Sequence, residues 1–235
     1  MDAIEFEGVR KTYGGKAALD GLNLRVGPGE VFALLGSNGA GKSTALRVLL
    51  GFTMPTAGRA SVLGVDCAAD PLGVRRRAAY VPEQVALYPS LTGLETLRYL
   101  LQLGGLSPPE AELLAACEAV GLGREAAVRP VGTYSKGMRQ KVALALAVAR
   151  KSDVLLLDEP TSGLDPQAAN ELSAAVRRLS EGGAAVLMAT HDIFRAREDA
   201  RRVGILRQGR LVRVLETADV RAVELERIYL EDMRS

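Results

Sequence analysis

Short runs of consecutive apolar residues are the most regular feature of the chain. We expect a strand at each run, and because both faces of such a strand are apolar, we expect it to be covered on both sides, as in a parallel sheet. These runs lie at 31–35, 79–81, 154–157 and 184–188. Other segments alternate more between apolar and polar positions, which predicts antiparallel or edge strands. They lie at 2–9, 22–26, 203–207 and 210–214.

Helix starts lie between these strands. Ser107-Pro108-Pro109-Glu110 and Thr92-Gly93-Leu94-Glu95 both match the capping-box pattern, the first with a proline at the first helical position. Asp165-Pro166 predicts the start of a helix that runs to about Leu179, and Gly182-Gly183 favours its end.

The stretch from about 85 to 150 contains helix patterns and no strong strand pattern. We therefore expect one domain over residues 1–235, with a core formed by about 1–84 and 151–235 and a helical subdomain inserted at about 85–150. The expected fold class is α/β, with a mostly parallel sheet, an antiparallel β part and the inserted helices. The sequence contains no internal repeat or low-complexity tract.

Composition narrows the possible functions. Of the 235 residues, 48% are hydrophobic and 25% are charged, and 30 basic against 28 acidic side chains give a net charge of +2. That balance does not favour nucleic-acid binding, which a basic stripe would indicate. Cys67 and Cys117 lie far apart in apolar surroundings, which indicates two free thiols and neither a metal site nor a disulfide framework.

No segment of the sequence resembles a membrane anchor. The chain begins with acids at Asp2 and Glu5, where a secretory signal would carry basic residues, and its longest apolar window is only Val142 to Ala149. A bilayer span requires about 20 apolar residues. We therefore expect a cytoplasmic protein whose link to any membrane passes through a partner.

A glycine-rich segment follows the run at 31–35. Gly36-Ser37-Asn38-Gly39-Ala40-Gly41-Lys42-Ser43 matches the P-loop pattern, and a helix is expected from Thr44 to Leu50. Glycines allow backbone N–H groups to surround phosphates, and the helix start adds a partial positive charge. We expect Lys42 to reach the outer phosphates and Ser43 to bind Mg²⁺.

Two acids follow the run at 154–157. Asp158 and Glu159 are expected at the carboxyl edge of the sheet, where α/β proteins bind ligands. Asp158 is expected to hold Mg²⁺ and Glu159 to accept a proton from the attacking water, or to orient it. On their own the acids could be a strand end meeting solvent, but the P-loop favours the catalytic interpretation.

Two further runs resemble those of ABC ATPases. Residues 158–166 resemble the Walker B and D-loop run, and residues 134–141 resemble the signature motif. The order of P-loop, Gln84, signature, carboxylates and His191 also fits, so the resemblance covers essentially the whole chain. Against the common signature Leu-Ser-Gly-Gly-Gln, this chain keeps Ser135 and Gly137. It replaces the others by Tyr134, Lys136 and Met138. Ser135 is expected to cap a helix over about 136–150.

The resemblance assigns further site residues. It implies that Tyr13 stacks on adenine and that Gln84 touches Mg²⁺ and senses the membrane partner. It implies that Asp165 belongs to the D-loop and that His191, the single histidine, contacts the γ-phosphate. Ser135 and Gly137 would contact the γ-phosphate bound by a second copy. The implied ATP-binding residues also include the P-loop: Gly36, Ser37, Asn38, Gly39, Ala40, Gly41, Lys42, Ser43 and Thr44.

The resemblance implies an ATPase subunit of an ABC transporter. ATP and Mg²⁺ would bind between two ATPase subunits, as a homodimer or heterodimer, and hydrolysis would drive separate transmembrane permease subunits from the cytoplasmic face of the membrane. Apolar residues after Gln84 would form part of a docking groove, or pack on their own subdomain: Val85, Leu87 and Tyr88.

Residues 50–58 and 134–140 resemble the daunorubicin- and sodium-exporter branch, which favours export. Three alternatives stay open at this point. An importer ATPase often carries an extra C-terminal regulatory domain, which is not expected here. A soluble ABC ATPase acting on ribosomes or DNA usually has two ATPase domains or a coiled-coil insertion. An unrelated P-loop kinase or GTPase would leave the signature and D-loop runs unexplained.

Overall fold

A six-stranded sheet forms the centre of the molecule. The computed structural model describes residues 2–234, so the end residues of the expected domain, Met1 and Ser235, lie outside it. The strand order is β10-β9-β3-β8-β7-β6. All neighbours pair in parallel except β10, which is antiparallel to β9. The strands are β3 (Val31–Leu35), β6 (Ala78–Val81), β7 (Val154–Asp158), β8 (Ala185–Thr190), β9 (Arg202–Arg207) and β10 (Arg210–Glu216).

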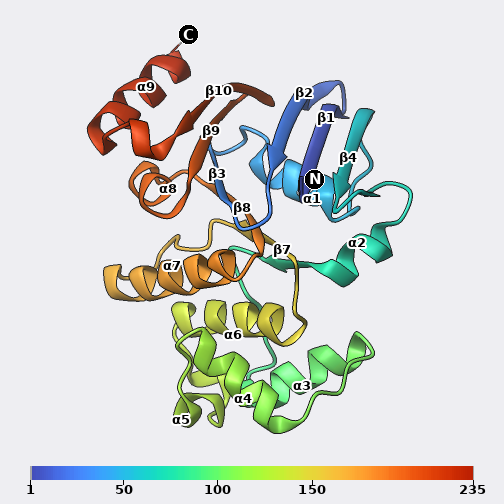
Figure 1. Ribbon diagram of the computed structural model, residues 1–235, viewed down its shortest axis with the longest axis vertical. Helices are drawn as coiled ribbons and strands as arrows, with labels where there is room; N and C mark the ends of the chain where they lie inside the picture. Colours follow the sequence, from blue (N-terminus) through green and yellow to red (C-terminus); the bar gives the residue numbers. More distant parts are fainter. Residues whose placement is uncertain (1, 235) are drawn as a thin grey trace.

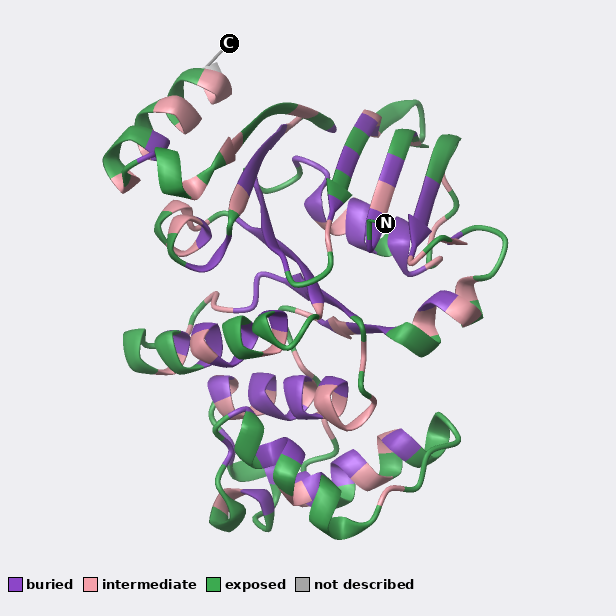
Figure 2. Cartoon of the chain, viewed as in Figure 1, coloured by how far each residue is buried: buried purple, intermediate pink, exposed green. Residues whose placement is uncertain are grey.

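The apolar runs form the parallel strands, as expected, because both faces of this sheet are covered. Within β3, Phe32 and Leu34 belong to one hydrophobic cluster, whereas Ala33 and Leu35 belong to another. Strands β3, β7 and β8 are buried along their whole length (Figure 2). The expected fold class, α/β with a mostly parallel sheet, is confirmed.

A second, antiparallel sheet has the order β2-β1-β4-β5. Its strands are β1 (Ile4–Tyr13), β2 (Lys16–Val26), β4 (Ala57–Val62) and β5 (Val65–Asp66). The patterns at 2–9 and 22–26 predicted parts of β1 and β2, but both strands are longer. Gly8 and Gly21, both with positive φ, interrupt their apolar–polar alternation. Helix α1 (Lys42–Leu49) shares one hydrophobic cluster with residues of both sheets.

The helices of the middle of the chain gather at one end of the molecule (Figure 1). They are α3 (Gly93–Leu103), α4 (Glu110–Ala119), α5 (Arg124–Ala127), the short 3₁₀ turn η1 (Val131–Thr133) and α6 (Lys136–Ala149). Helix α6 shares one hydrophobic cluster with these helices and with the central sheet. The division of the chain near 84 and 150 stays a prediction, because α6 belongs structurally to both sides.

Five further helices complete the fold within residues 2–234. Helix α7 covers the face of the sheet that also meets α6, and α8 and α9 lie near β9 and β10 (Figure 1). The sequence reasoning gave α1 and α7 but not α2, α8 or α9. Besides α1, they are α2 (Pro71–Arg77), α7 (Pro166–Glu181), α8 (Ile193–Asp199) and α9 (Ala222–Arg234), with a 3₁₀ turn η2 (Thr217–Asp219) before α9.

The helix caps test the expected starts. Thr92 Oγ1 accepts from the Glu95 backbone N–H, and Glu95 accepts from that of Thr92, so this capping box is confirmed. Asp165 caps α7 through the Ala168 N–H. The box expected at Ser107 is wrong. Helix α4 begins at Glu110 with Pro109 in the cap position and no side-chain cap, because the two prolines lie before the helix and separate Ser107 from its first turn.

Three findings on the described residues 2–234 concern membrane spans, free cysteines and metal clusters. No helix there has both the length and the apolar character needed to span a bilayer. Cys67 and Cys117 are buried and free, as expected. Within the same range, no group of three or more His, Cys, Asp or Glu side chains forms a metal cluster.

Candidate active site

The candidate residues converge at the carboxyl edge of the central sheet. Strands β3, β8 and β7 are neighbours and run in parallel, so the segments that follow them meet at one edge. The glycine-rich loop follows β3, Glu159 follows β7, and His191 follows β8 directly. Sheet topology therefore brings together three separate segments, of which the glycine-rich loop lies more than a hundred residues before the other two.

The loop at 36–41 requires glycine at specific positions. A Cβ at Gly36 would lie 2.6 Å from the carbonyl oxygen of Leu206, and one at Gly41 would lie 2.3 Å from that of Ala18. Gly41 also has a φ of +113° and caps α1 without any side-chain acceptor. The first N–H groups of α1 are therefore left for a ligand, which favours an anion at this helix start.

Lys42 lies folded back into this loop. Its Nζ donates to the carbonyl oxygens of Gly36 at 2.6 Å and Ser37 at 3.3 Å, and it lies 3.3 Å from Glu159 Oε1. The residue is only 5% exposed. A nearly buried ammonium group beside a carboxylate is electrostatically compensated, and it supplies positive charge where phosphates would bind.

Asp158 and Ser43 form a compact oxygen cluster. Asp158 Oδ1 accepts from Ser43 Oγ at 3.0 Å, and Oδ2 accepts from the Tyr80 hydroxyl at 3.3 Å. Burial raises the pKa of Asp158, and these two hydrogen bonds offset the effect only in part. Burial and the nearby Asp158 raise the pKa of Tyr80 to about 12. The sequence reasoning missed Tyr80, although it is the polar-tipped residue of its apolar strand.

Hydroxyl and carboxylate oxygens are the ligands that Mg²⁺ prefers, so Ser43 and Asp158 fit that ion. The raised pKa of Asp158 supports the fit, because it indicates a buried carboxylate whose charge the protein itself does not fully compensate.

Glu159 adopts a backbone conformation that glycine usually occupies. Its φ is +47°, and its N–H donates to the Ala189 carbonyl at 2.8 Å. Left-handed backbone costs a residue with a Cβ about 1–2 kcal/mol, and such strain is concentrated at functional sites. The turn aims the carboxylate back toward the P-loop and not along the strand, where a simple strand end would point.

The Glu159 carboxylate contacts both Lys42 and His191. Oε2 accepts from the His191 backbone N–H at 3.3 Å and lies 2.8 Å from Nδ1 of the same residue. Oε1 is buried and has no hydrogen-bond partner, since the 3.3 Å approach of Lys42 lacks hydrogen-bond geometry. The His191 side chain is 54% exposed, so it is not a core histidine. Oε1 is therefore paired in charge with Lys42 but makes no hydrogen bond.

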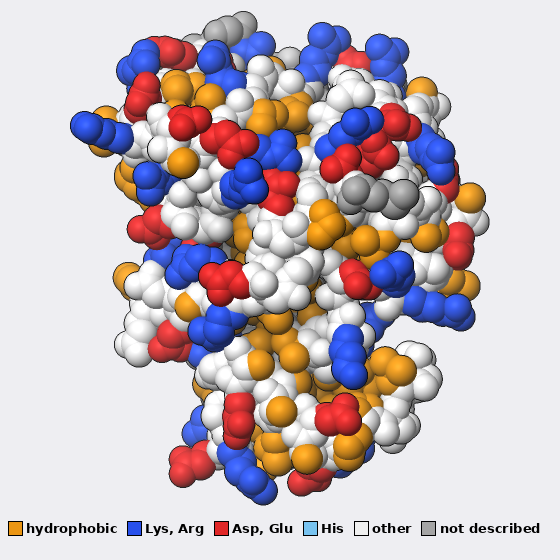
Figure 3. Space-filling model, viewed as in Figure 1, with side chains coloured by type: hydrophobic (Ala, Val, Ile, Leu, Met, Phe, Trp, Pro, Cys, Tyr) orange, Lys and Arg blue, Asp and Glu red, His pale blue; other side chains and the backbone are white. Residues whose placement is uncertain are grey.

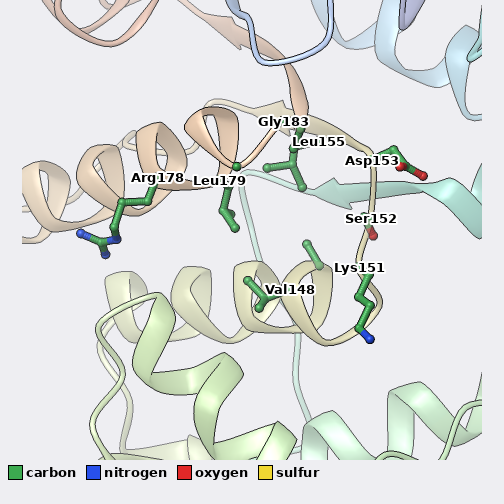
Figure 4. A pocket seen from close by; sticks show the side chains of 11 residues that line it. Val148, Lys151, Ser152, Asp153, Leu155, Arg178, Leu179 and Gly183 are labelled. Atoms are coloured by element: carbon green, nitrogen blue, oxygen red, sulfur yellow. The ribbon is translucent and has the colours of Figure 1, made fainter.

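A cavity of about 200 Å³ lies between the loop and the two acids. Its lining includes the expected residues Ser37, Asn38, Gly39, Gly41, Lys42, Ser43, Thr44, Asp158 and Glu159, together with Ala18 and Glu83. A larger hollow of about 360 Å³ lies at the opposite, amino end of β7, where Leu155, Leu179 and Val148 face it (Figure 4). No candidate residue lines that hollow. A cavity of about 670 Å³ on the other side of the glycine-rich loop is lined in part by Ser37, Asn38, Gly39 and Ala40.

Several expected residues lie outside this cavity. Tyr13 is 48% exposed and its hydroxyl lies 3.2 Å from Thr53 Oγ1. Gln84 is exposed, and the neighbouring Glu83 lines the cavity in its place. Neither Ser135 nor Gly137 lines it. Their expected roles stay predictions.

The signature segment has a well-defined local structure. Ser135 caps α6, accepting from the Met138 N–H at 3.2 Å, and is itself exposed. Gly137 packs against the start of α7, where a Cβ would lie 3.1 Å from the Ala168 Cβ. Asp165 caps α7 beside it. An exposed, serine-capped helix start is suited to an anion approaching from outside the chain.

Comparisons with known proteins agree with this geometry. A family profile described as ABC transporter matches residues 19–162. The daunorubicin/doxorubicin resistance ATP-binding protein DrrA of Streptomyces peucetius is 37% identical, covering 99% of this chain and 72% of that protein. Nod factor export ATP-binding protein I of Burkholderia thailandensis is 40% identical, covering 89% and 69%.

A solved structure adds evidence on assembly. A dimeric ATP-binding cassette in a post-hydrolysis state, bound to ADP and phosphate, matches with a TM-score of 0.81 and 27% identity. The match covers 91% of this chain and 98% of the other.

Proposed function

This chain belongs to the ABC transporter ATP-binding proteins, and from that premise we propose that two copies of it, or this chain and a similar one, bind ATP between them and drive export through separate membrane-spanning chains. It is an ABC-type ATPase that binds adenine nucleotides. The observation that carries the proposal is the cluster of Lys42, Glu159 and His191 beside the glycine-rich loop.

Each side chain of that cluster has a defined role. Glu159 accepts a proton from the attacking water, because its carboxylate lines the cavity and its Oε1, although paired in charge with Lys42, makes no hydrogen bond. Lys42 stabilises the negative charge of the outer phosphates. His191 lies at 2.8 Å from the carboxylate and orients it, and its exposed ring is free to contact the terminal phosphate.

A magnesium ion would be held by Ser43 and Asp158, with Gln84 joining when its loop closes. The ion would neutralise phosphate charge. Before it binds, the Ser43 hydroxyl and the Asp158 carboxylate are already paired at 3.0 Å, so their oxygens are positioned on the same side of the cavity. Tyr80 holds the second carboxylate oxygen.

The second half of the ATP site is proposed to come from a second copy. Ser135 is exposed at a helix start, and no described residue of the same chain other than its own helix uses its hydroxyl. Ser135 and Gly137 of one copy would face the P-loop of the other, with Asp165 alongside. The dimeric cassette bound to ADP and phosphate supports this arrangement by similarity. Tyr13, exposed at the end of β1, would stack on adenine.

The membrane partner is proposed to dock beside the helical part. A groove of about 530 Å³ is lined by apolar Leu72, Leu103 and Leu106 and by arginines 75, 76 and 150. In the space-filling view, a notch with apolar and basic side chains on its walls separates the helical part from the rest (Figure 3). Such walls suit a helix with apolar and acidic residues.

Of the apolar residues after Gln84, two pack within the chain and one is exposed for docking. Val85 and Leu87 are partly buried against the main hydrophobic cluster, which is the packing alternative. Tyr88 is 60% exposed and meets Tyr99 edge-on, so it stays available to a partner. Docking would place the chain at the cytoplasmic face of a membrane.

Export is favoured over import by similarity. One relative is a drug resistance ATP-binding protein and another is an export ATP-binding protein. A soluble ABC ATPase acting on ribosomes or DNA is the remaining candidate. Copurification distinguishes the two, because a transporter subunit should bring down a polytopic membrane protein, whereas a translation factor should bring down ribosomes.

The test of ATP-driven dimerisation uses Glu159→Gln. This change removes the proton acceptor but keeps the shape, so ATP with Mg²⁺ should accumulate a dimer and hydrolysis should fall at least about a hundredfold. Light scattering coupled to size exclusion measures the mass. Glu112→Gln, a change of an exposed acid on α4, is the matched control and should accumulate none. A monomer of Glu159→Gln in excess ATP would refute the proposal.

A further inference from the structure

The side chain of Lys136 departs from the common signature and makes a contact that a glycine could not. Lys136 is the first residue of α6, directly after Ser135. Its Nζ donates to the Ser162 carbonyl at 2.5 Å and lies 3.5 Å from the Cβ position of Gly163. Its charge therefore does not point outward from the helix start but lies on the loop of its own chain that follows Glu159.

That loop, residues 160–165, has few other anchors. The Ser162 N–H donates to the Glu159 carbonyl at 3.2 Å, and the Leu164 N–H donates to that of Thr161 at 3.2 Å. Both of these bonds are internal to the segment that starts at Glu159. The Lys136 bond instead ties the loop to α6 at Ser162, three residues after the catalytic carboxylate of Glu159.

A second connection joins α6 to the loop at 82–84. Gln140 is fully buried one turn after Lys136, and its Nε2 donates to the carbonyls of Pro82 and Glu83, both at 3.0 Å. Glu83 lines the cavity, and its Oε1 accepts from Ser162 Oγ at 3.4 Å. Helix α6 and the two loops beside Glu159 therefore form a closed ring of contacts.

We propose that Lys136 is a positioning residue for hydrolysis, holding the loop that begins at Glu159 against the first turn of α6. The inference rests on the proposed function, in which that helix start faces nucleotide on a second copy. When the helix start moves to meet the nucleotide, the Lys136 bond makes the loop move with it. The bond thereby keeps the loop, and with it the orientation of Glu159, fixed to α6 when the dimer forms.

The contact is a charge-assisted hydrogen bond to a backbone carbonyl, half-buried between two elements. Such bonds are stronger than hydrogen bonds between neutral groups. Losing one displaces a loop most when the loop has few other hydrogen bonds to hold it. The loop does not form the P-loop cradle, so losing the bond should leave ATP binding intact. Losing the bond should disturb the orientation of Glu159 and therefore lower the rate of hydrolysis.

The experiment compares Lys136→Met with Lys136→Arg in the full chain. Lys136→Met keeps the stem but cannot donate, so kcat should fall about tenfold while KM for ATP stays within about twofold. Lys136→Arg can still donate to Ser162 and should keep most of the activity. Should Lys136→Met fold poorly, Lys136→Gln, which is too short to reach, is measured in its place with the same expected loss.

Lys141 offers the matched control on the same helix. Its Nζ binds Glu171 at 2.6 Å and the Gly121 carbonyl at 3.0 Å, and it contacts no part of the loop at 160–165. Lys141→Met should lower the melting temperature and leave kcat unchanged. An unchanged kcat in Lys136→Met, or the same loss of kcat in Lys141→Met, would overturn the inference. A wild-type chain without ATPase activity would instead overturn the proposed function.

Discussion

The backbone of Glu159 shows how a single residue is prepared for its role. A φ of +47° is unfavourable for a glutamate, and three contacts hold it there: its own N–H to Ala189, and its carboxylate to His191 and Lys42. This conformation costs folding free energy, and it turns the carboxylate back over the cavity. A strand end that merely met solvent would not need this conformation, so the geometry favours the catalytic interpretation.

At the residue scale, His191→Ala should slow hydrolysis more than it weakens ATP binding. The imidazole contacts the Glu159 carboxylate, whereas the proposed phosphate contacts come mostly from the loop N–H groups and Lys42. We expect kcat to fall at least about tenfold and the affinity for ATP, measured by calorimetry, to change by less than about threefold. Equal losses in both quantities would point to a structural role.

A second residue-scale prediction concerns Asp158. Burial raises its pKa above the ordinary value of 3.8, so the fold binds this proton more tightly than the unfolded chain does. Protonated Asp158 therefore favours folding, and this contribution is lost as the pH rises from 3.8 through the raised pKa. Asp158→Asn removes the carboxylate and should raise the free energy of unfolding at about pH 8.

The gain from Asp158→Asn should disappear only at pH values well below 3.8, where the wild-type carboxylate is protonated in both the folded and the unfolded state. Denaturant unfolding at several pH values without nucleotide measures it, and a pH-independent difference would refute the explanation. The same variant should lose hydrolysis in Mg²⁺, because the amide cannot replace the carboxylate charge.

Most of the glycines and charged residues that the sequence predicts for the site line one cavity, because their types and spacing follow from the chemistry of phosphate, and their roles stay predictions. The sequence did not predict Tyr80, whose role depends on β6 pairing with β7, a contact between residues far apart in the chain. Glu83 was missed for a similar reason. Its place in the cavity depends on Gln140, which holds its backbone from another helix.

At the element scale, local capping patterns succeeded where nothing competed with them. Thr92 and Asp165 cap α3 and α7 as expected. Ser107 does not cap α4, because two prolines come before the helix start and α4 begins only at Glu110. Strands β4 and β5 were missed because β4 is exposed along its first half and β5 has only two residues, so neither has a strong apolar pattern.

Thr92→Ala and Ser107→Ala test this difference directly. Thr92→Ala removes the acceptor for the Glu95 N–H and should cost about 1 kcal/mol of unfolding free energy. For a chain of this size that lowers the melting temperature by about 2–4 °C. Ser107→Ala should change it by less than about 1 °C. A comparable loss in both variants, measured by calorimetric melting, would contradict the cap assignment.

At the scale of the whole molecule, the central sheet separates two hydrophobic clusters. One contains α1 and the antiparallel sheet, and the other contains α6, α7 and the helical part (Figure 1). The P-loop belongs to the first side and the serine-capped helix to the second. A single chain therefore carries the two proposed half-sites on different elements, which is the arrangement expected if two copies complete each other.

The sequence predicted both half-sites but could not place them relative to one another, since that depends on how α6 packs on α7. The close contact of Gly137 with Ala168 provides part of that packing. Assembly between copies is a property of two surfaces, and its evidence comes from the exposed Ser135 and from the similar dimeric cassette.

The most direct test is a structure of Glu159→Gln solved with ATP and Mg²⁺. The account predicts two copies facing each other, with Ser135 Oγ of each about 3 Å from the terminal phosphate that is bound at the other copy's Lys42. If the nucleotide is bound but Ser135 contacts only solvent or its own chain, the shared site does not exist and the transport mechanism built on it is wrong.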